Sequence, residues 1–271
     1  MPTLFVVATP IGNLEDISLR ALRILSEVSL IAAEDTRKTR RLLNRYSIKT
    51  PMTSYYEHNK LAKLDHILTC LREGDVALVS DAGTPGMSDP GYELVVEANR
   101  NGIPVIPIPG PSAVTTALTV SGLATDRFTF LGFLPRKAGE RQARLKSVID
   151  EPSTLVILET PHRLLAAFQD LLAVLGDRRI AVCRELTKLH EEVFRGKISQ
   201  AVEHFTRPRG EFTLVIEGKI ENNEPELTKE IREQIHSLHL SGIRAKEAVT
   251  QVAGETGLSR KELYRAWLEE A

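Results

Sequence analysis

Residues 76–86 read VALVSDAGTPG, and this stretch decides the fold. Four consecutive apolar residues, two of them β-branched, predict a short strand that is buried on both faces. The residues that follow include two glycines and one proline, which turn the chain sharply and let its backbone approach a ligand. This combination is typical of an open parallel sheet, in which ligands bind beyond the carboxyl ends of the strands.

The same pattern recurs along the chain. Similar apolar runs occupy 4–8, 30–33, 105–108, 128–131, 155–158, 180–183 and 212–216. Segments with helical periodicity lie between them, at 19–28, 61–72, 93–101, 113–120, 142–149 and 163–175. The alternation predicts an α/β protein with largely parallel sheets that helices cover on both faces.

Two breaks divide this pattern. Four prolines crowd the end of the strand at 105–108, which favours two sheets rather than one. A polar linker follows the last strand at 221–225, and beyond it the pattern is purely helical. We therefore predict two α/β domains, at 1–112 and 113–221, and a small helical domain at 222–271.

The composition excludes several classes. The 271 residues carry a formal net charge of −1 and only two cysteines, which disfavours a disulfide scaffold and a cysteine zinc site. The seven histidines are scattered, so we predict no metal. The N-terminus shows no leader pattern, and no apolar run approaches the roughly 20 residues that span a bilayer. We expect a cytoplasmic protein without a membrane segment.

The loops after the strands carry the functional signal. Loops similar to 80–86 follow other strands, at 9–14, 109–113, 159–163 and 184–188. Any one of them is most simply a turn, but several at strand carboxyl ends indicate a rigid site lined by backbone. The chain has no G-x-G-x-x-G, G-x-x-x-x-G-K-[ST] or G-x-S-x-G motif, which disfavours ordinary dinucleotide binding, P-loop NTPases and α/β-hydrolases.

The loops at 9–14, 80–86 and 109–113 resemble the tetrapyrrole methylase superfamily. That resemblance implies an S-adenosylmethionine-dependent methyltransferase, with the cofactor in a cleft between two α/β domains. The stretches 33–37, 57–59, 159–163 and 184–188 are similar to the branch that methylates the ribose 2′-hydroxyl of a cytidine in the decoding region of 16S ribosomal RNA. The resemblance covers residues 3 to about 219 and the helical tail, and it suggests a homodimer.

The same resemblance implies cofactor-binding residues in both domains. First-domain loops would line the methionine end of the cofactor and border the cleft where substrate meets the methyl group, and second-domain residues would lie near the adenosine. The residues so implied are Asp81, Ala82, Gly83 and Thr84 at the methionine end, Ser112 and Ala113 after the linking strand, Leu158, Leu186 and Thr213 near the adenosine, and Pro10 and Gly12 at the border.

A basic window predicts the substrate side. Residues 35–63 hold eight lysines and arginines against two acidic residues, a net charge of +6, together with three of the five tyrosines. Basic side chains neutralise phosphates and aromatic rings stack on splayed bases, although a charge run is most often a solvated helix face. A second basic segment spans 127–146. The predicted RNA-binding residues are Arg37, Lys38, Arg41, Tyr55 and Lys60.

Two carboxylates at a strand end are candidates for a general base. Methyl transfer needs the ribose oxygen aligned with the methyl group, and a base helps because a ribose hydroxyl is a poor nucleophile. Glu34 and Asp35 follow the strand at 30–33 and precede Arg37. The alternative for Asp35 is a structural role as the N-cap of the following helix.

The tail at 222–271 has a helix-turn-helix pattern, with Gly257 in the turn and Ser259 as the predicted N-cap of the second helix. Arg260, Lys261 and Arg265 give that helix a basic side, which suits docking to ribosomal RNA. The alternative is a helical domain that packs on its neighbour, and the tail's net charge of −2, from seven basic and nine acidic residues, favours that alternative.

Two other functions compete. One is a methyltransferase of the same fold that acts on a tetrapyrrole or a protein side chain, against which the basic window and the tail argue. The other is a non-catalytic nucleic-acid-binding protein, which leaves the glycine- and proline-rich loops unexplained.

Overall fold

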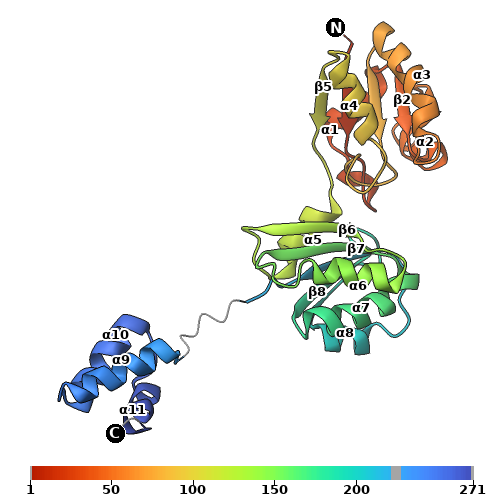
Figure 1. Cartoon of the computed structure of the whole chain (residues 1–271). Coiled ribbons are helices and arrows are strands. Elements are labelled where there is room, and N and C mark those ends of the chain that lie inside the picture. The colour runs from red at the N-terminus through yellow and green to blue at the C-terminus, as the bar shows by residue number, and fades with distance from the viewer. Residues whose placement is uncertain (1, 221–226, 270–271) are drawn as a thin grey trace. The chain divides into compact units, whose positions relative to one another are not determined.

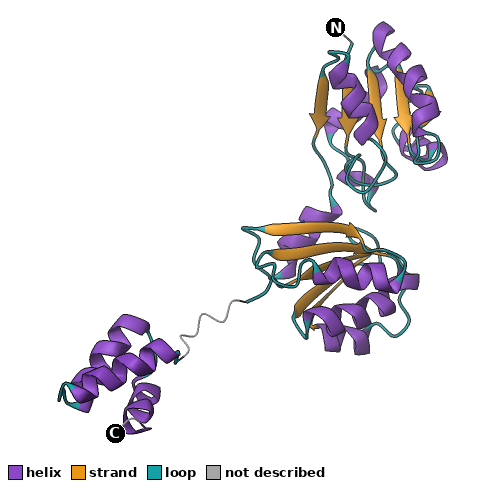
Figure 2. Cartoon of the chain, viewed as in Figure 1, coloured by secondary structure: helices purple, strands orange, loops and turns teal. Residues whose placement is uncertain are grey.

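The computed structural model describes residues 2–220 and 227–269. The chain divides into two compact units, Met1–Lys219 and Ile220–Ala271. The larger unit contains two five-stranded sheets with their helices, and the smaller one is helical (Figures 1 and 2). The predicted boundary at residues 221 and 222 lies outside the described residues.

The first sheet is parallel throughout, as its apolar runs predict. Its strand order is β3-β2-β4-β1-β5, so the apolar run at 76–79 forms its central strand. The strands are β1 (Leu4–Val7), β2 (Leu30–Ala33), β3 (Met52–Ser54), β4 (Val76–Val79) and β5 (Val105–Ile108). The helices are α1 (Leu19–Glu27), α2 (Thr36–Arg45), α3 (Lys60–Glu73) and α4 (Tyr92–Arg100), with the 3₁₀ turn η1 (Leu14–Asp16).

Side chains of these short strands point alternately to the two faces of the sheet, and a hydrophobic core lies on each face. Val7, Ile31 and Val79 pack with α1 and α2 on one face. Leu4 and Leu78 pack with α3 and α4 on the other. Because both faces are covered, the carboxyl edge of the sheet is the part of it that remains available for a ligand.

The second sheet differs from the sequence prediction. Its order is β6-β7-β10-β8-β9, and only β6 and β7 pair in parallel, because β10 runs antiparallel to both of its neighbours. The strands are β6 (Phe128–Phe133), β7 (Thr154–Glu159), β8 (Arg179–Arg184), β9 (Glu192–Lys197) and β10 (Phe212–Ile216). The prediction of largely parallel sheets was wrong here, since a buried run such as 212–216 shows that a strand is central but not which way it runs.

Helices also cover both faces of this sheet. Helix α5 (Ala113–Ser121) packs on one face, through Val114, Ala117 and Leu118. Helices α6 (Ala138–Lys146), α7 (Pro161–Leu175) and α8 (Ile198–His204) cover the other face. Helix α5 follows directly from β5 of the first sheet, so the loop at 109–112 joins the two sheets.

The smaller unit consists of α9 (Lys229–Leu240), α10 (Ala245–Thr256) and α11 (Arg260–Glu269). Ile235, Val252, Leu263 and Trp267 form its buried core. Gly257 adopts φ +73°, and the Ser259 hydroxyl accepts a hydrogen bond from the backbone of Glu262, as the turn and N-cap predictions require. Within the ranges that the structure describes, no helix is both long and apolar enough to cross a membrane.

Candidate active site

Two first-domain loops are joined before they reach the site. The backbone groups of Thr9 and Gly83 exchange two hydrogen bonds of 2.9 Å, which form an isolated antiparallel bridge. Gly83 adopts φ +76° there, a conformation that disfavours any side chain. The loop after β1 and the loop after β4 therefore form one rigid surface.

The loop after β1 also touches the second domain. The backbone N–H of Asn13 donates to the Thr187 hydroxyl at 3.0 Å. A Cβ atom placed on Gly12 would lie 2.5 Å from Lys188 Cγ and 2.7 Å from Thr187 Oγ1. Gly12 is thus required for the close approach of the two loops.

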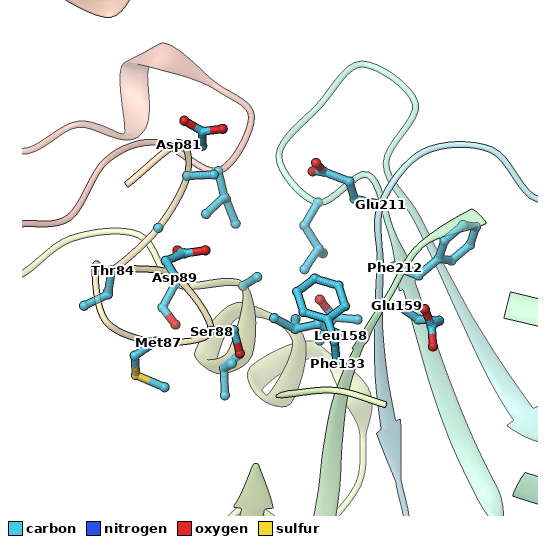
Figure 3. A pocket seen from close by; sticks show the side chains of 18 of the residues that line it. Asp81, Thr84, Met87, Ser88, Asp89, Phe133, Leu158, Glu159, Glu211 and Phe212 are labelled. Carbon is cyan, nitrogen blue, oxygen red and sulfur yellow. The ribbon is translucent and has the colours of Figure 1, made fainter. Parts of the chain in front are cut away.

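A cavity of about 420 Å³ lies between the carboxyl edge of the first sheet and the second sheet (Figure 3). This volume falls within the range of small-molecule and cofactor sites. The cavity is lined by Ile11, Glu34, Lys38, Asp81, Ala82, Gly83, Thr84, Met87, Ser88, Asp89, Ser112, Ala113, Val114, Phe133, Leu158, Glu159, Thr160, Cys183, Leu186, Glu211, Phe212 and Thr213.

One wall carries three carboxylates and a lysine, and Asp81 links most of them. The backbone N–H of Asp81 donates to Glu34 Oε2 at 3.0 Å. The Asp81 carboxylate accepts hydrogen bonds from the backbone N–H of Asp35 at 3.0 Å and from Lys38 Nζ at 2.7 Å. The strand ends of β2 and β4 are thereby fixed to each other, with their carboxyl groups at the cavity.

Asp89 is the third carboxylate on this wall. Burial raises the pKa of its carboxyl to about 7, and the nearby carboxylates of Glu34 and Asp81 act in the same direction. Burial also raises the pKa of Glu34. A positive charge that enters the cavity would favour the ionised form of both groups.

Asp35 has a different environment. Its side chain accepts a hydrogen bond from the backbone N–H of Arg37 at 2.8 Å and so caps α2, as the structural alternative required. It also pairs with the Arg37 guanidinium through Nε at 3.1 Å and Nη2 at 2.8 Å. These bonds hold the pKa of Asp35 well below its usual range, which makes it a poor proton acceptor.

The opposite wall comes from the second sheet. It contains the apolar side chains of Leu158, Leu186 and Phe133, with Thr213 on the central strand β10. Figure 3 shows Leu158 and Phe133 across the cavity from Asp81, Thr84 and Asp89. The cavity is therefore anionic on the side of the first sheet, whereas the side of the second sheet is apolar at Leu158, Leu186 and Phe133 and also carries the carboxylates of Glu159 and Glu211.

Strained backbone is concentrated in the same loops. Ser88, Glu185 and Thr187 have φ angles of 68°, 50° and 66°, which side-chain-bearing residues rarely adopt. Ser88 lines the cavity, and the other two flank Leu186, which also lines it. Strain of this kind persists where surrounding contacts fix a functional loop.

The structure brings most of the predicted site residues together. The predicted residues that line the cavity are Glu34, Lys38, Asp81, Ala82, Gly83, Thr84, Ser112, Ala113, Leu158, Leu186 and Thr213. Pro10, Gly12 and Asp35 do not line it. Gly12 acts instead in the contact with the second domain.

The predicted RNA-binding residues are separated by the structure. Arg37 and Arg41 are exposed on α2, whereas Lys38 is bonded to Asp81. Tyr55 is completely buried in the first-domain core, so it offers no ring face to a base, and Tyr56 is the exposed neighbour. Lys60 pairs with Glu57 at 2.8 Å and Glu93 at 2.6 Å and is 19% exposed.

Sequence reasoning missed two prominent residues of the cavity. Asp89 lies in the same glycine- and proline-rich segment as Asp81, and the length of that segment was the signal that could have identified it. Phe133 lies two residues beyond the predicted end of its strand at 131. Its exposure depends on an irregularity in strand pairing that the apolar pattern does not show.

Comparisons with known proteins agree with this architecture. The family model for tetrapyrrole (corrin/porphyrin) methylases matches residues 3–202. A protein of Halalkalibacterium halodurans named ribosomal RNA small subunit methyltransferase I is 47% identical over 277 residues, which cover 99% of this chain and 95% of that protein. A protein of Thermotoga maritima with the same name is 52% identical over 222 residues, which cover 81% of this chain and all of that protein.

Solved structures share the fold. The structure of a uroporphyrin-III C-methyltransferase from Thermus thermophilus complexed with S-adenosyl homocysteine superimposes with a TM-score of 0.57. It is 20% identical and covers 79% of this chain and 97% of its own. The predicted two-domain α/β fold is confirmed, and so is the predicted family. The chain belongs to the tetrapyrrole methylases and, among them, to the family of ribosomal RNA small subunit methyltransferase I.

Proposed function

We propose that this chain transfers the methyl group of S-adenosylmethionine to the 2′-hydroxyl of a cytidine in 16S ribosomal RNA of the small ribosomal subunit. The observation that carries the proposal is high identity, over nearly the whole chain, to relatives named for methylation of that RNA. The cavity supports it, because it places carboxylates of the first sheet opposite apolar side chains of the second.

The residues present fit the cofactor. S-adenosylmethionine supplies an electrophilic methyl group on a positively charged sulfonium. The carboxylates of Glu34, Asp81 and Asp89 face the cavity and offset a positive charge there. The backbone of 81–84 suits the methionine end, and Leu158, Leu186 and Thr213 suit the adenosine.

Proton removal falls to a carboxylate of the same wall. A general base works best when its pKa is near the working pH, and the pKa of Asp89 is about 7. Glu34, whose pKa is also raised, remains a candidate base. Asp35 is assigned to positioning, because its carboxylate is occupied by α2 and Arg37.

The substrate side lies on α2. Arg37 and Arg41 are exposed at a spacing of four residues, which places them on one face of this helix. Helix α2 begins directly after Glu34 and Asp35, so a phosphate bound by these arginines lies near the cavity wall. Among the predicted RNA contacts we carry forward these two: Arg41, which has no ion pair to any described residue, and Arg37, which is exposed while it pairs with Asp35.

The direct test is methyl transfer to small subunits that lack the modification. The protein is incubated with isotope-labelled S-adenosylmethionine and such subunits, and the labelled nucleotide is mapped by nuclease digestion and mass spectrometry. We expect one labelled 2′-O-methylcytidine. Label on a base, on ribosomal protein or nowhere would refute the proposal. Glu34→Gln, which preserves the side chain's shape, should slow single-turnover transfer about 10²- to 10⁴-fold if Glu34 is the base.

We further propose a cytoplasmic homodimer organised as domains 1–112, 113–221 and 222–271. Cys70 and Cys183 are free thiols, which suits a reducing compartment. Light scattering with size-exclusion chromatography checks the dimer: a mass of one chain, about 30.1 kDa, at micromolar concentration would contradict it.

The tail is proposed to dock the substrate rather than to build the catalytic site. The Thermotoga maritima relative is matched completely by 81% of this chain, so about a fifth of the chain has no counterpart in it. Arg260, Lys261 and Arg265 are exposed on α11. Calorimetry tests the competing reading of a binding protein without activity: absence of S-adenosylmethionine binding would rule out a methyltransferase.

A further inference from the structure

Phe133 is an aromatic side chain at the cavity whose place in the fold needs an explanation. It is the last residue of β6, lines the cavity and is 47% exposed. The next residue, Leu134, is only 2% exposed. Because the next residue is buried, the backbone at Phe133 is held in place, and Phe133 does not lie at a frayed strand end.

An irregularity in β6 directs the ring toward the cavity. Phe130 pairs with Val156 and Phe133 pairs with Leu158, so three residues of β6 stand opposite two of β7. Side chains alternate between the faces of a strand, and without the extra residue Phe133 would point to the face covered by α6 and α7. The bulge places Phe133 on the face of Leu158, which lines the cavity. Bulges beside active sites commonly re-aim a side chain in this way.

Two arginines then hold the loop that follows. Arg163 Nη2 donates to the carbonyl of Leu134. Arg141 Nη1 donates to the carbonyls of Pro135 at 3.4 Å and Arg136 at 3.0 Å. Three consecutive carbonyls are thus bound by side chains, which fixes the backbone immediately after Phe133.

These arginines are themselves held by buried carboxylates. Arg141 Nε lies 2.6 Å from Asp170 Oδ2, and both side chains are about nine-tenths buried. Arg163 Nε lies 3.3 Å from Glu159 Oε1, and the Glu159 side chain is fully buried. Burying two ion pairs costs desolvation energy that apolar residues would not incur. The arrangement is better explained by positioning the 134–136 loop than by stability.

The loop presents a cation beside the ring. Arg136 is exposed, and its side chain forms no ion pair with any residue in 2–220 or 227–269. Lys137, its neighbour, pairs with Glu140 at 3.1 Å. The end of β6 also abuts the first domain, because a Cβ atom on Gly132 would lie 3.0 Å from Ser88 Oγ. Phe133, the next residue, therefore lies beside the segment that carries Asp89, and Arg136 follows it three residues later in the chain.

We propose that Phe133 stacks on the base of the target nucleotide turned out of the RNA, and that Arg136 binds a phosphate next to it. This inference rests on the proposed function and assigns it a substrate-contacting pair. A stacking platform with a neighbouring cation is the usual way to hold an unpaired nucleotide. Stacking fixes the ribose with its base, and the 2′-hydroxyl then lies at a constant place relative to the carboxylate wall.

The test compares matched variants at the two ends of β6. Phe133→Leu removes the aromatic face, Phe133→Tyr restores it, and Phe128→Leu is the control, because Phe128 is 44% exposed at the other end of the strand. Methylation of unmodified small subunits gives kcat/KM, and calorimetry gives the affinity for S-adenosylmethionine. We expect Phe133→Leu to lower kcat/KM about 5- to 150-fold, with cofactor affinity unchanged, and the other two variants to behave as wild type.

Arg136 is tested through salt dependence. Arg136→Ala should reduce the slope of log affinity for the subunit against log salt by about one, and Arg136→Lys should restore it. Arg127→Ala, at the other end of β6, is the control. Wild-type kinetics in Phe133→Leu, or a loss that follows weakened cofactor binding, would overturn the inference while the proposed function stands. A wild-type protein that methylates no subunit would overturn both.

Discussion

Asp89 makes a prediction about how pH controls cofactor binding. Burial and the carboxylates of Glu34 and Asp81 raise the pKa of Asp89 to about 7 in the protein without ligand. A sulfonium in the cavity favours the ionised form and lowers that pKa. Binding therefore releases a proton from Asp89, and by linkage the affinity for the positively charged cofactor rises with pH.

The magnitude follows from the pKa. With a value near 7, about one tenth of the Asp89 carboxyls are ionised at pH 6 and about nine tenths at pH 8. If the cofactor binds only the ionised form, its affinity rises about tenfold over this interval. At pH 7 about half a proton is released for each molecule bound. Lys38, which is bonded to Asp81, stays charged throughout, because that hydrogen bond raises its pKa.

The assay is isothermal titration calorimetry with two ligands. S-adenosylmethionine carries the sulfonium, and S-adenosylhomocysteine has an uncharged sulfur with the same amino-acid and adenosine groups. The ratio of their affinities isolates the charge on sulfur, because titration of the shared groups cancels. Repeating the measurement in buffers of different ionisation enthalpy counts the protons released.

Asp89→Asn keeps the shape of the side chain and removes its titration. We expect the affinity ratio of the wild type to rise about tenfold between pH 6 and pH 8 and that of Asp89→Asn to be nearly flat. Glu34→Gln is a second variant: it removes a neighbouring charge that raises the pKa of Asp89, so its affinity ratio should still rise with pH but with the midpoint at lower pH. A flat ratio in the wild type, or an unchanged slope in Asp89→Asn, would refute the reasoning.

Three further predictions concern the buried Arg141–Asp170 pair, the loop at Gly12 and the helical tail. Asp170→Asn leaves Arg141 buried without its charge partner, so urea unfolding should show a loss of about 3–5 kcal/mol, and a loss below 1 kcal/mol would mean that the Arg141 charge is not left buried and uncompensated. Gly12→Ala places a Cβ atom 2.5 Å from Lys188 Cγ, so cofactor affinity should fall by about 1–3 kcal/mol, as measured by calorimetry, whereas unchanged affinity would mean that the loops adjust freely. Deleting 222–271 should leave cofactor affinity intact and weaken binding to small subunits in sedimentation assays, and intact subunit binding would eliminate the docking role.

The sequence predicts the first sheet better than the second. The runs at 4–8, 30–33, 76–80 and 105–108 become parallel strands, because a helix between successive strands returns the chain to the same end of the sheet, whereas the three-residue edge strand at 52–54 was not predicted. In the second domain the apolar runs locate four strands correctly but leave their directions open. The strand at 192–197 was missed because it is an edge strand with mixed polarity, Glu-Val-Phe-Arg-Gly-Lys.

The candidate site shows the same division between local and long-range information. Strand-end loops converge because parallel strands share a carboxyl edge, and so most of the proposed cofactor residues line one cavity. Tyr55 and Lys60 were chosen by charge and aromatic content alone, and the structure buries one in the core and pairs the other with two glutamates. Phe133 depends on a bulge, which a strand pattern does not reveal.

Ion pairs neutralise part of the positive charge of the basic window at 35–63. Of its eight cations, Arg37 is paired with Asp35, Lys38 with Asp81, and Lys60 with Glu57 and Glu93. Asp81 and Glu93 lie outside the window, so a count restricted to 35–63 overstates the positive charge available to RNA. The cations without an ion pair to any described residue are Arg40, Arg41, Arg45, Lys49 and Lys63, and three of these lie on α2. In the proposed function, the exposed face of α2 is therefore the part of the window that would attract phosphate, whereas Lys38 belongs to the cavity wall.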